Sequence, residues 1–389
     1  MKKLIIPILL SLVAFKGMAQ EPGNDNTGIE NRVITTGVPF ILIAADPRAA
    51  GMGDIGVTTS ADAFSQQWNP AKYAFSLSKQ GVGVTYTPYL SKLVNDIFLG
   101  NITYYNRLNE RSAVAASFRY FSNGEIELRQ TAEEEPLLVK PNELLFDVSY
   151  SLRLSERFSM AVAGRYIRSD LKLQTAIEDA SAASSFAVDI AGYYQSEEIP
   201  YNDFDGRWRM GFNISNIGPK LKYDEVGSES NLPTNLALGG GFDFILDEYN
   251  KVGVSAQVNK LLVPTPSDSN DDGIINSEDD YYNESFFGGM FSSFGDAPDG
   301  FSEELKEFTW ALGAEYWYQD VFAFRGGYFN ESDDKGSRKF ASIGAGFRYT
   351  AINIDISYLF STSKLANSPL DGTLRFGLTF NFGDTYDEY

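Results

Sequence analysis

The chain has 389 residues and a formal net charge of −20, and it contains neither histidine nor cysteine. Without cysteine there is no disulfide framework, thiol nucleophile or thiolate metal site, and without histidine the commonest general base and transition-metal ligand is missing. An acidic chain also lacks the basic face that nucleic-acid phosphates require, which argues against nucleic acid as a partner.

The first 19 residues have the features of a signal peptide. Lys2 and Lys3 precede a short apolar stretch, and Gly17-Met18-Ala19 supplies small residues for cleavage before Gln20. The alternative, a membrane anchor, needs an apolar run of roughly 20 residues, and this one is shorter. No apolar run of spanning length follows, so a membrane location for the mature chain requires a closed β-barrel, which satisfies its own backbone polar groups.

Period-two alternation recurs through most of the mature chain, as in a strand with one apolar and one polar face. In one segment apolar residues alternate with small or polar ones: Leu144, Phe146, Val148 and Tyr150 with Asp147, Ser149 and Ser151. The pattern predicts an all-β transmembrane barrel with lipid outside and a hydrated or plugged lumen inside.

Fourteen such segments are predicted within 81–382, followed by an acidic tail at 383–389. They lie near 81–89, 94–106, 111–121, 143–154, 158–170, 184–195, 207–217, 234–246, 251–261, 307–318, 321–330, 338–350, 352–360 and 372–382. Links after even segments are tight except 196–206, and the links after odd segments include the long stretches 122–142, 171–183, 218–233, 262–306 and 361–371. A β-sandwich, the alternative, has no such parity. We therefore expect short periplasmic turns, long outer loops and both termini in the periplasm of a Gram-negative bacterium.

Residues 20–80 precede the first strand and are rich in small residues, with only weak periodicity. We interpret them as a plug inside the barrel, because Phe64, Trp68 and Tyr73 argue against the alternative of a disordered periplasmic arm. The motif residues expected in this plug are Asp62, Ala63, Asn69, Pro70 and Ala71.

The run 49–53, the pair Asp62-Ala63 and the triplet Asn69-Pro70-Ala71, ahead of a fourteen-strand pattern, resemble the FadL-like outer-membrane family. Within that family the chain is similar, over residues 30–382, to the barrel component of the type IX secretion system. The resemblance implies a protein without chemistry of its own, which takes cargo bearing a C-terminal signal domain from the large translocon barrel. It implies delivery to a sortase-like attachment protein that links cargo to lipopolysaccharide. The family offers no contact motif to transfer, so only the outer loops are implicated.

The sharpest local motif is the acidic segment 268–279, whose oxygen-bearing residues have the spacing of an EF-hand calcium loop, with Gly273 at the turn position. Its expected Ca²⁺ ligands are Asp268, Asn270, Asp272, Ile274 through its carbonyl, Asn276 and Asp279. Hard carboxylate oxygens suit Ca²⁺ better than a transition metal. The alternative is a solvated acidic loop with chance spacing.

Two other function classes compete with secretion. An outer-membrane enzyme is disfavoured by the absence of histidine. A FadL-like transporter of hydrophobic small molecules would need an apolar lumen, whereas Arg153, Glu315 and Arg375 are expected to face inward. The aromatic stretch 281–291 predicts either a loop core or a partner site.

Overall fold

The computed structural model describes residues 32–91, 94, 96–129, 135–171, 181–223, 229–270, 272, 274–363 and 371–386. The predicted signal peptide and the mature start at Gln20 lie outside this part of the chain. No helix within it is long and apolar enough to cross a membrane.

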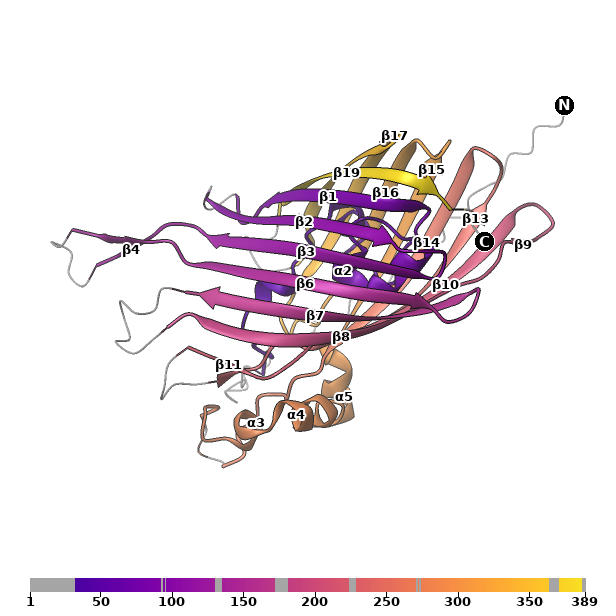
Figure 1. Ribbon diagram of the computed structural model, residues 1–389. Coiled ribbons are helices and arrows are strands. Elements are labelled where there is room, and N and C mark those ends of the chain that lie inside the picture. Colours follow the sequence, from indigo (N-terminus) through magenta and orange to yellow (C-terminus); the bar gives the residue numbers. More distant parts are fainter. Residues whose placement is uncertain are drawn as a thin grey trace. The chain divides into compact units, whose positions relative to one another are not determined.

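Fourteen antiparallel strands close into a barrel (Figure 1), which confirms the predicted fold class and strand number. They are β1 (Ser78–Pro88), β2 (Ile97–Arg107), β3 (Ser112–Asn123), β6 (Asn142–Arg153), β7 (Phe158–Asp170), β8 (Ala183–Gln195), β10 (Asp205–Ile217), β13 (Asn235–Ile245), β14 (Asn250–Leu261), β15 (Phe308–Tyr318), β16 (Phe322–Asn330), β17 (Lys339–Tyr349), β18 (Ile352–Ser361) and β19 (Leu374–Thr385). The ring closes because β1 pairs with both β19 and β2, and β10 pairs with β13. Closure leaves the barrel sheet without an edge exposed to lipid.

The two faces of each strand follow the predicted alternation. On β6, Phe146, Val148 and Tyr150 are exposed on the outside, while Asp147 and Ser149 are fully buried in the lumen. The outward apolar row is solvated by lipid, and the inward polar row meets the N-terminal segment. Strand β19 continues to Thr385, because Thr385 pairs with Ser78, so the strand includes the first residues of the predicted acidic tail.

The longest links gather at one end of the barrel, as predicted, although 196–204 at the other end is slightly longer than 89–96 and 331–338. At one end, which we call the turn end, the links are 108–111, 154–157, 196–204, 246–249, 319–321 and 350–351. The third of these carries the small strand β9 (Ile199–Pro200), which pairs with the start of β10. At the opposite end, the loop end, lie the long links.

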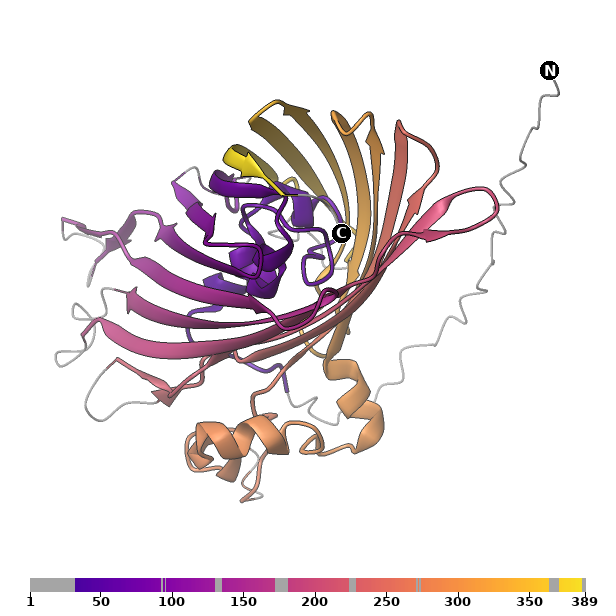
Figure 2. The same cartoon turned by 45° about the vertical axis from the view of Figure 1, so that its right-hand side comes forward.

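The long links contain structure of their own. The link after β3 holds the hairpin β4 (Ile126–Leu128) and β5 (Leu137–Val139), and the link after β10 holds β11 (Leu221–Lys222) and β12 (Glu229–Ser230). The link after β14 holds α3 (Asp280–Asn283), α4 (Phe286–Ser292), α5 (Phe301–Glu304) and the 3-10 helix η4 (Leu305–Glu307). In both views of the ribbon these helices lie outside the ring of strands (Figures 1 and 2).

The N-terminal segment runs along the lumen from the loop end to the turn end. Its short helices are η1 (Pro39–Leu42), α1 (Pro47–Ala50), α2 (Ser65–Trp68) and η2 (Pro70–Phe75). Arg32 lies at the loop end, where it contacts Glu303 at 2.9 Å. Ser76 lies at the turn end, where its hydroxyl donates to Tyr105. A periplasmic N-terminus at Gln20 stays a prediction.

Candidate functional site

Residues 38–76 fill much of the lumen, and most of their side chains are buried. At the loop end Phe40 and Ile41 pack among Leu99, Phe121 and Leu145 of the wall. At the turn end Tyr73 stacks on Tyr105, with ring centroids 5.0 Å apart. The segment therefore contacts the inner wall along its whole length.

A network of buried charges joins this segment to the wall. Glu315 accepts hydrogen bonds from Arg48 Nη2 at 2.8 Å and from Arg325 Nε at 2.6 Å. Arg325 also contacts Asp355 at 2.6 Å, and Arg48 contacts Asp62 at 2.9 Å. Each buried guanidinium thus has two carboxylate partners, which is the condition under which buried ions are tolerated.

The predicted motif residues lie together in this segment. Besides pairing with Arg48, Asp62 accepts from the amide of Phe64 at 2.9 Å, and the carbonyl of Ala63 accepts from the Tyr73 hydroxyl at 2.9 Å. The Asn69 side chain donates to two carbonyls, those of Val57 and Gly192, and accepts from the amide of Ala71. The bond from the Ala71 amide caps η2, which begins at Pro70.

Glycines on the inward faces of strands give the segment its space. A Cβ built on Gly327 would lie 2.0 Å from the backbone carbon of Met52, and one on Gly313 would lie 2.6 Å from the Met52 carbonyl oxygen. A Cβ on Gly211 would lie 2.4 Å from the Val57 carbonyl oxygen. Only glycine allows the two backbones to come this close. Inward glycines were a signal of the path of the N-terminal segment that the sequence reasoning missed.

A cavity of about 670 Å³ lies between the N-terminal segment and the wall near the loop end. Phe40, Ile41 and Phe121 contribute apolar surface, while Arg338 and Arg375 contribute charge. The Arg375 guanidinium reaches the carbonyl of Ala44 at 3.1 Å, so it faces the lumen as predicted. The cavity is therefore amphipathic, neither a greasy channel nor a purely polar pore.

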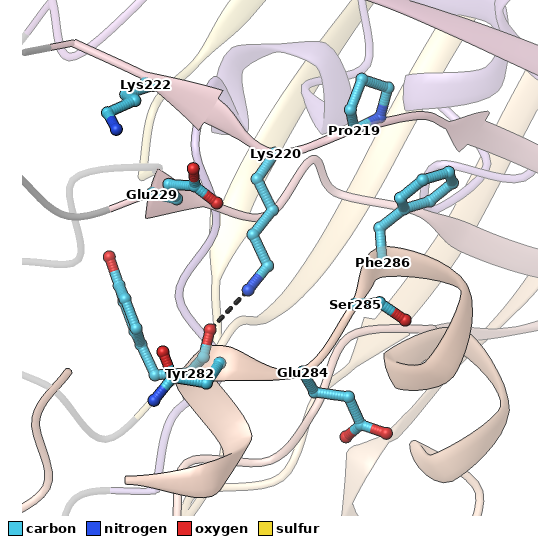
Figure 3. Close-up of a pocket in the computed structure, with 9 residues that line it drawn as sticks. Pro219, Lys220, Lys222, Glu229, Tyr282, Glu284, Ser285 and Phe286 are labelled. Carbon is cyan, nitrogen blue, oxygen red and sulfur yellow. Dashed lines mark hydrogen bonds between the residues drawn. The ribbon is translucent and has the colours of Figure 1, made fainter. Parts of the chain in front are cut away.

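A second hollow, of about 570 Å³, lies among the outer loops (Figure 3). Lys220 and Lys222 border it beside β11, and Tyr282, Glu284 and Phe286 border it from the helices of the long loop. The Lys220 ammonium donates to the Tyr282 carbonyl. Burial lowers the pKa of Lys220, against the opposing effect of nearby Glu229 and Glu284. The groove carries both charge signs and aromatic rings, as protein-binding surfaces commonly do.

The predicted calcium loop is folded on its own side chains. The Asp272 amide donates to the side chains of Asp268 and Asn270, at 3.2 and 3.0 Å. Asp279, which is buried, accepts from the amides of Ser269 and Asn276, each at 2.8 Å. Gly273 lies outside the described residues.

The described carboxylates of this loop do not lie close enough to one another to hold a metal ion. Among the residues that the structure describes, one group of three carboxylates has oxygens within 4.8 Å of one another, and it consists of Asp296, Glu304 and Glu307. The Lys260 ammonium contacts Glu304 at 2.6 Å and Glu307 at 2.7 Å, so a cation already occupies that group. Calcium at 268–279 therefore stays a proposal, in which Asn276 and the Ile274 carbonyl would complete the ligand set.

Calcium binding is testable on the purified protein. We expect isothermal titration to show one site with a Kd of about 10⁻⁴ to 10⁻³ M, the range of extracellular calcium modules. Asp268→Ala should abolish the heat of binding, whereas the control Asp203→Ala, at an exposed position in a turn-end link, should leave it unchanged. Absence of a calcium heat in the unaltered protein would reduce the loop to a solvated acidic segment.

Comparison with known proteins gives one family. The family model described as "Type IX secretion system protein PorV" matches residues 26–268, well over half of the chain. Curated proteins give no sequence match. The family match confirms the resemblance drawn from the sequence motifs.

Solved structures give the same fold at low identity. The CymD monoaromatic hydrocarbon channel has a TM-score of 0.51 at 13% identity, covering 88% of this chain and 98% of that one. A deltaS2 mutant of the TodX monoaromatic hydrocarbon channel has a TM-score of 0.50 at 10% identity, covering 87% and 98%. A Pseudomonas aeruginosa FadL homologue has a TM-score of 0.45 at 13% identity, covering 91% and 100%. At such identities the likeness concerns the fold alone.

Proposed function

Because the chain belongs to the PorV family of type IX secretion system proteins, we propose that it acts as a non-enzymatic adaptor of that system in the outer membrane. In this role it binds cargo bearing a C-terminal signal domain as the cargo leaves the large translocon barrel. It then delivers the cargo to the sortase-like attachment protein, which joins it to lipopolysaccharide.

The observation that carries this proposal is the N-terminal segment packed inside the barrel. Residues 38–76 are packed against the wall and tied to it by the Arg48–Glu315 ion pair at 2.8 Å. Even without this segment, fourteen strands enclose less space than the 16–18 strands that make an aqueous channel for small solutes. A secreted protein would therefore have to be handled at the rim and loops of this barrel, outside its lumen.

The loop end offers surfaces for such partners. The β4–β5 hairpin projects beyond the strand ends (Figure 1) and exposes Ile126, Leu137 and Leu138. Exposed apolar groups on a hairpin that lies away from the lipid band are typical of protein contacts. The groove between β11 and the long loop adds a polar and aromatic surface nearby. In this proposal the loop end faces the cell exterior and the end of β19 faces the periplasm.

The export phenotype tests the proposal. Deleting the gene should leave signal-bearing cargo uncleaved in the periplasm or in the translocon, because no adaptor receives it. Immunoblots of cell fractions for the retained C-terminal signal measure this, with the intact gene restored as control. Normal secretion and surface attachment in the deletion strain would contradict the adaptor role.

A hairpin deletion separates partner binding from barrel assembly. Phe121 pairs with Glu143, so an Asn-Gly turn can replace residues 122–142 without changing the register of β3 and β6. We expect this variant to keep the heat-resistant gel mobility of a folded barrel but to lose co-purification with its partners. Shortening 262–306 would be a less clean test, because it would also uncover Lys260.

The second candidate function is transport of hydrophobic small molecules, and the amphipathic cavity at the loop end favours it. Its volume of about 670 Å³ lies within the usual range for small-molecule sites. The neighbouring folds are hydrocarbon channels by description. This reading gives the opposite phenotype: normal export in the deletion strain, with loss of uptake of apolar compounds.

A further inference from the structure

A lysine on the lipid-facing side of the barrel is fully buried. On β14 the exposed residues Val254 and Val258 face outward and Gln257 faces the lumen, where it accepts from the amide of Val57. Lys260 continues the outward row, two residues beyond Val258, yet its side chain has no exposed surface. Something outside the wall therefore covers it.

The cover is the last part of the long loop. Glu304 of α5 and Glu307 of η4 both contact the Lys260 ammonium, at 2.6 and 2.7 Å. The rings of Phe294 and Phe308 lie 5.9 and 5.2 Å from the same ammonium. Phe308 is the direct neighbour of Lys260 on β15, also on the outward face. These contacts hold the end of the long loop against the loop-end rim of the wall, beside the outward row of β14.

Further contacts fix this position at the rim. Lys335, from the link between β16 and β17, contacts Glu303 at 2.7 Å and Glu307 at 3.0 Å. Burial alone would raise the pKa of Glu303, but the hydrogen bond from Lys335 and the charges of Lys335 and Arg32 hold it below its usual value. The end of the long loop is therefore bound to the barrel through the charged side chains of α5 and η4.

The rest of this segment presents aromatic side chains to its surroundings. On α4, Gly289 packs on Pro264, whereas Phe287 and Phe291, one turn apart on the other face, are 56% and 72% exposed. Phe301 and Leu305, also one turn apart, are 76% and 54% exposed. Exposed phenylalanines at this density are unusual on a surface that meets only water.

We propose that residues 286–305 form an interfacial foot, which lies at the boundary of headgroups and acyl chains and inserts Phe287, Phe291, Phe301 and Leu305 into the lipid. The partner is a lipid surface because the foot covers an outward, lipid-side residue and continues the apolar row of Val258 and Phe308. Short segments with an aromatic face and a polar opposite face bind membranes in this way. The exposed polar residues of the foot include Asp299 and Ser302, and the exposed Lys306 directly follows it.

The chain has no cysteine, so single cysteines can carry a nitroxide label at chosen positions without removing others. The test labels are at Phe291→Cys and Phe301→Cys. Val258→Cys, on the outward face of β14, is the lipid reference, and Glu127→Cys, exposed on the β4–β5 hairpin, is the water reference. Each full-length variant is reconstituted into phosphatidylcholine vesicles, and its label is measured for accessibility to oxygen and to a water-soluble nickel chelate.

We expect the oxygen-to-nickel accessibility ratio at 291 and 301 to approach that at 258 and to exceed that at 127 several-fold. A ratio equal to that at 127 would overturn the proposal. So would labels that stay water-accessible in vesicles and become shielded only when the purified translocon barrel is added, because the foot would then be a protein-docking surface. Gel mobility of each variant, heated and unheated, verifies that the barrel is folded.

Discussion

Replacing Glu315 by glutamine is expected to free the N-terminal segment from the wall while the barrel stays closed. Glu315 is the shared acceptor of Arg48 and Arg325, and all three side chains are buried. The amide keeps the shape of the carboxylate but loses its charge and turns a donor group toward two guanidinium groups. Removing one partner of a buried ion pair costs about 3–5 kcal/mol.

Hydrogen exchange measures this loss locally. A cost of about 3 kcal/mol corresponds to roughly a hundredfold faster opening, so amides of residues 44–60 should exchange about that much faster in Glu315→Gln. Peptides from the strands should keep their slow exchange, because the barrel ladder does not depend on the network. Glu248→Gln, exposed in a turn-end link, is the control. Equal exchange in the two variants would mean that shape complementarity alone holds the segment.

The strands could be predicted from the sequence because successive residues of a barrel strand face lipid and lumen in turn. All fourteen predicted segments match a strand, and β1 is typical, predicted at 81–89 and observed at Ser78–Pro88. The lipid requires apolar side chains outside and the lumen accepts polar ones, so the alternation persists over ten or more residues. The alternation of mostly short and mostly long links along the chain, which distinguishes the two ends of the barrel, could be predicted for the same reason.

The contacts inside the lumen could not be predicted, because they join distant parts of the chain. Arg48 and Glu315 are 267 positions apart, and nothing in either local sequence names the other. The sequence shows only that inward faces are polar. Glycines such as Gly327 can be found in the sequence. An isolated glycine in a strand can indicate a bulge, a bend or a close backbone approach, and only the structure shows which of these applies.

The loop elements were missed for a different reason. The β4–β5 hairpin has strands of three residues, too short to show a periodic pattern, and α5 has four residues. Such elements form because tertiary contacts hold them, as Lys260 holds Glu304. The sequence shows the aromatic stretch within 281–291 but not what surrounds it. Its surroundings depend on which side of the wall it occupies, and we infer that side from the buried Lys260.

A matched pair of glycines on β16 separates the space needed by the N-terminal segment from any general effect of substitution. Gly327 faces the lumen, where a Cβ would meet the Met52 carbon at 2.0 Å and the Gly53 nitrogen at 2.3 Å, both backbone atoms. Gly326, its neighbour, faces outward, and a Cβ there has no neighbour within 4 Å. Overpacking typically costs about 1–3 kcal/mol, so Gly327→Ala should displace the segment near Met52, whereas Gly326→Ala should behave as the unaltered protein.

Planar-bilayer conductance reads this displacement directly. We expect Gly327→Ala to pass several-fold more ionic current than Gly326→Ala, with both variants keeping the gel mobility of a folded barrel. If Gly327→Ala passes no more current than Gly326→Ala, the wall has moved to make room and the segment has stayed in place.

The same pair of variants also tests the function, because in the adaptor proposal the protein works from its rim and cargo never enters its lumen. If the protein is an adaptor, Gly327→Ala cells should leak small solutes yet still secrete and attach their surface proteins. If it is a transporter, Gly327→Ala should alter the uptake of apolar compounds. Deletion of the gene should then leave protein export unaffected.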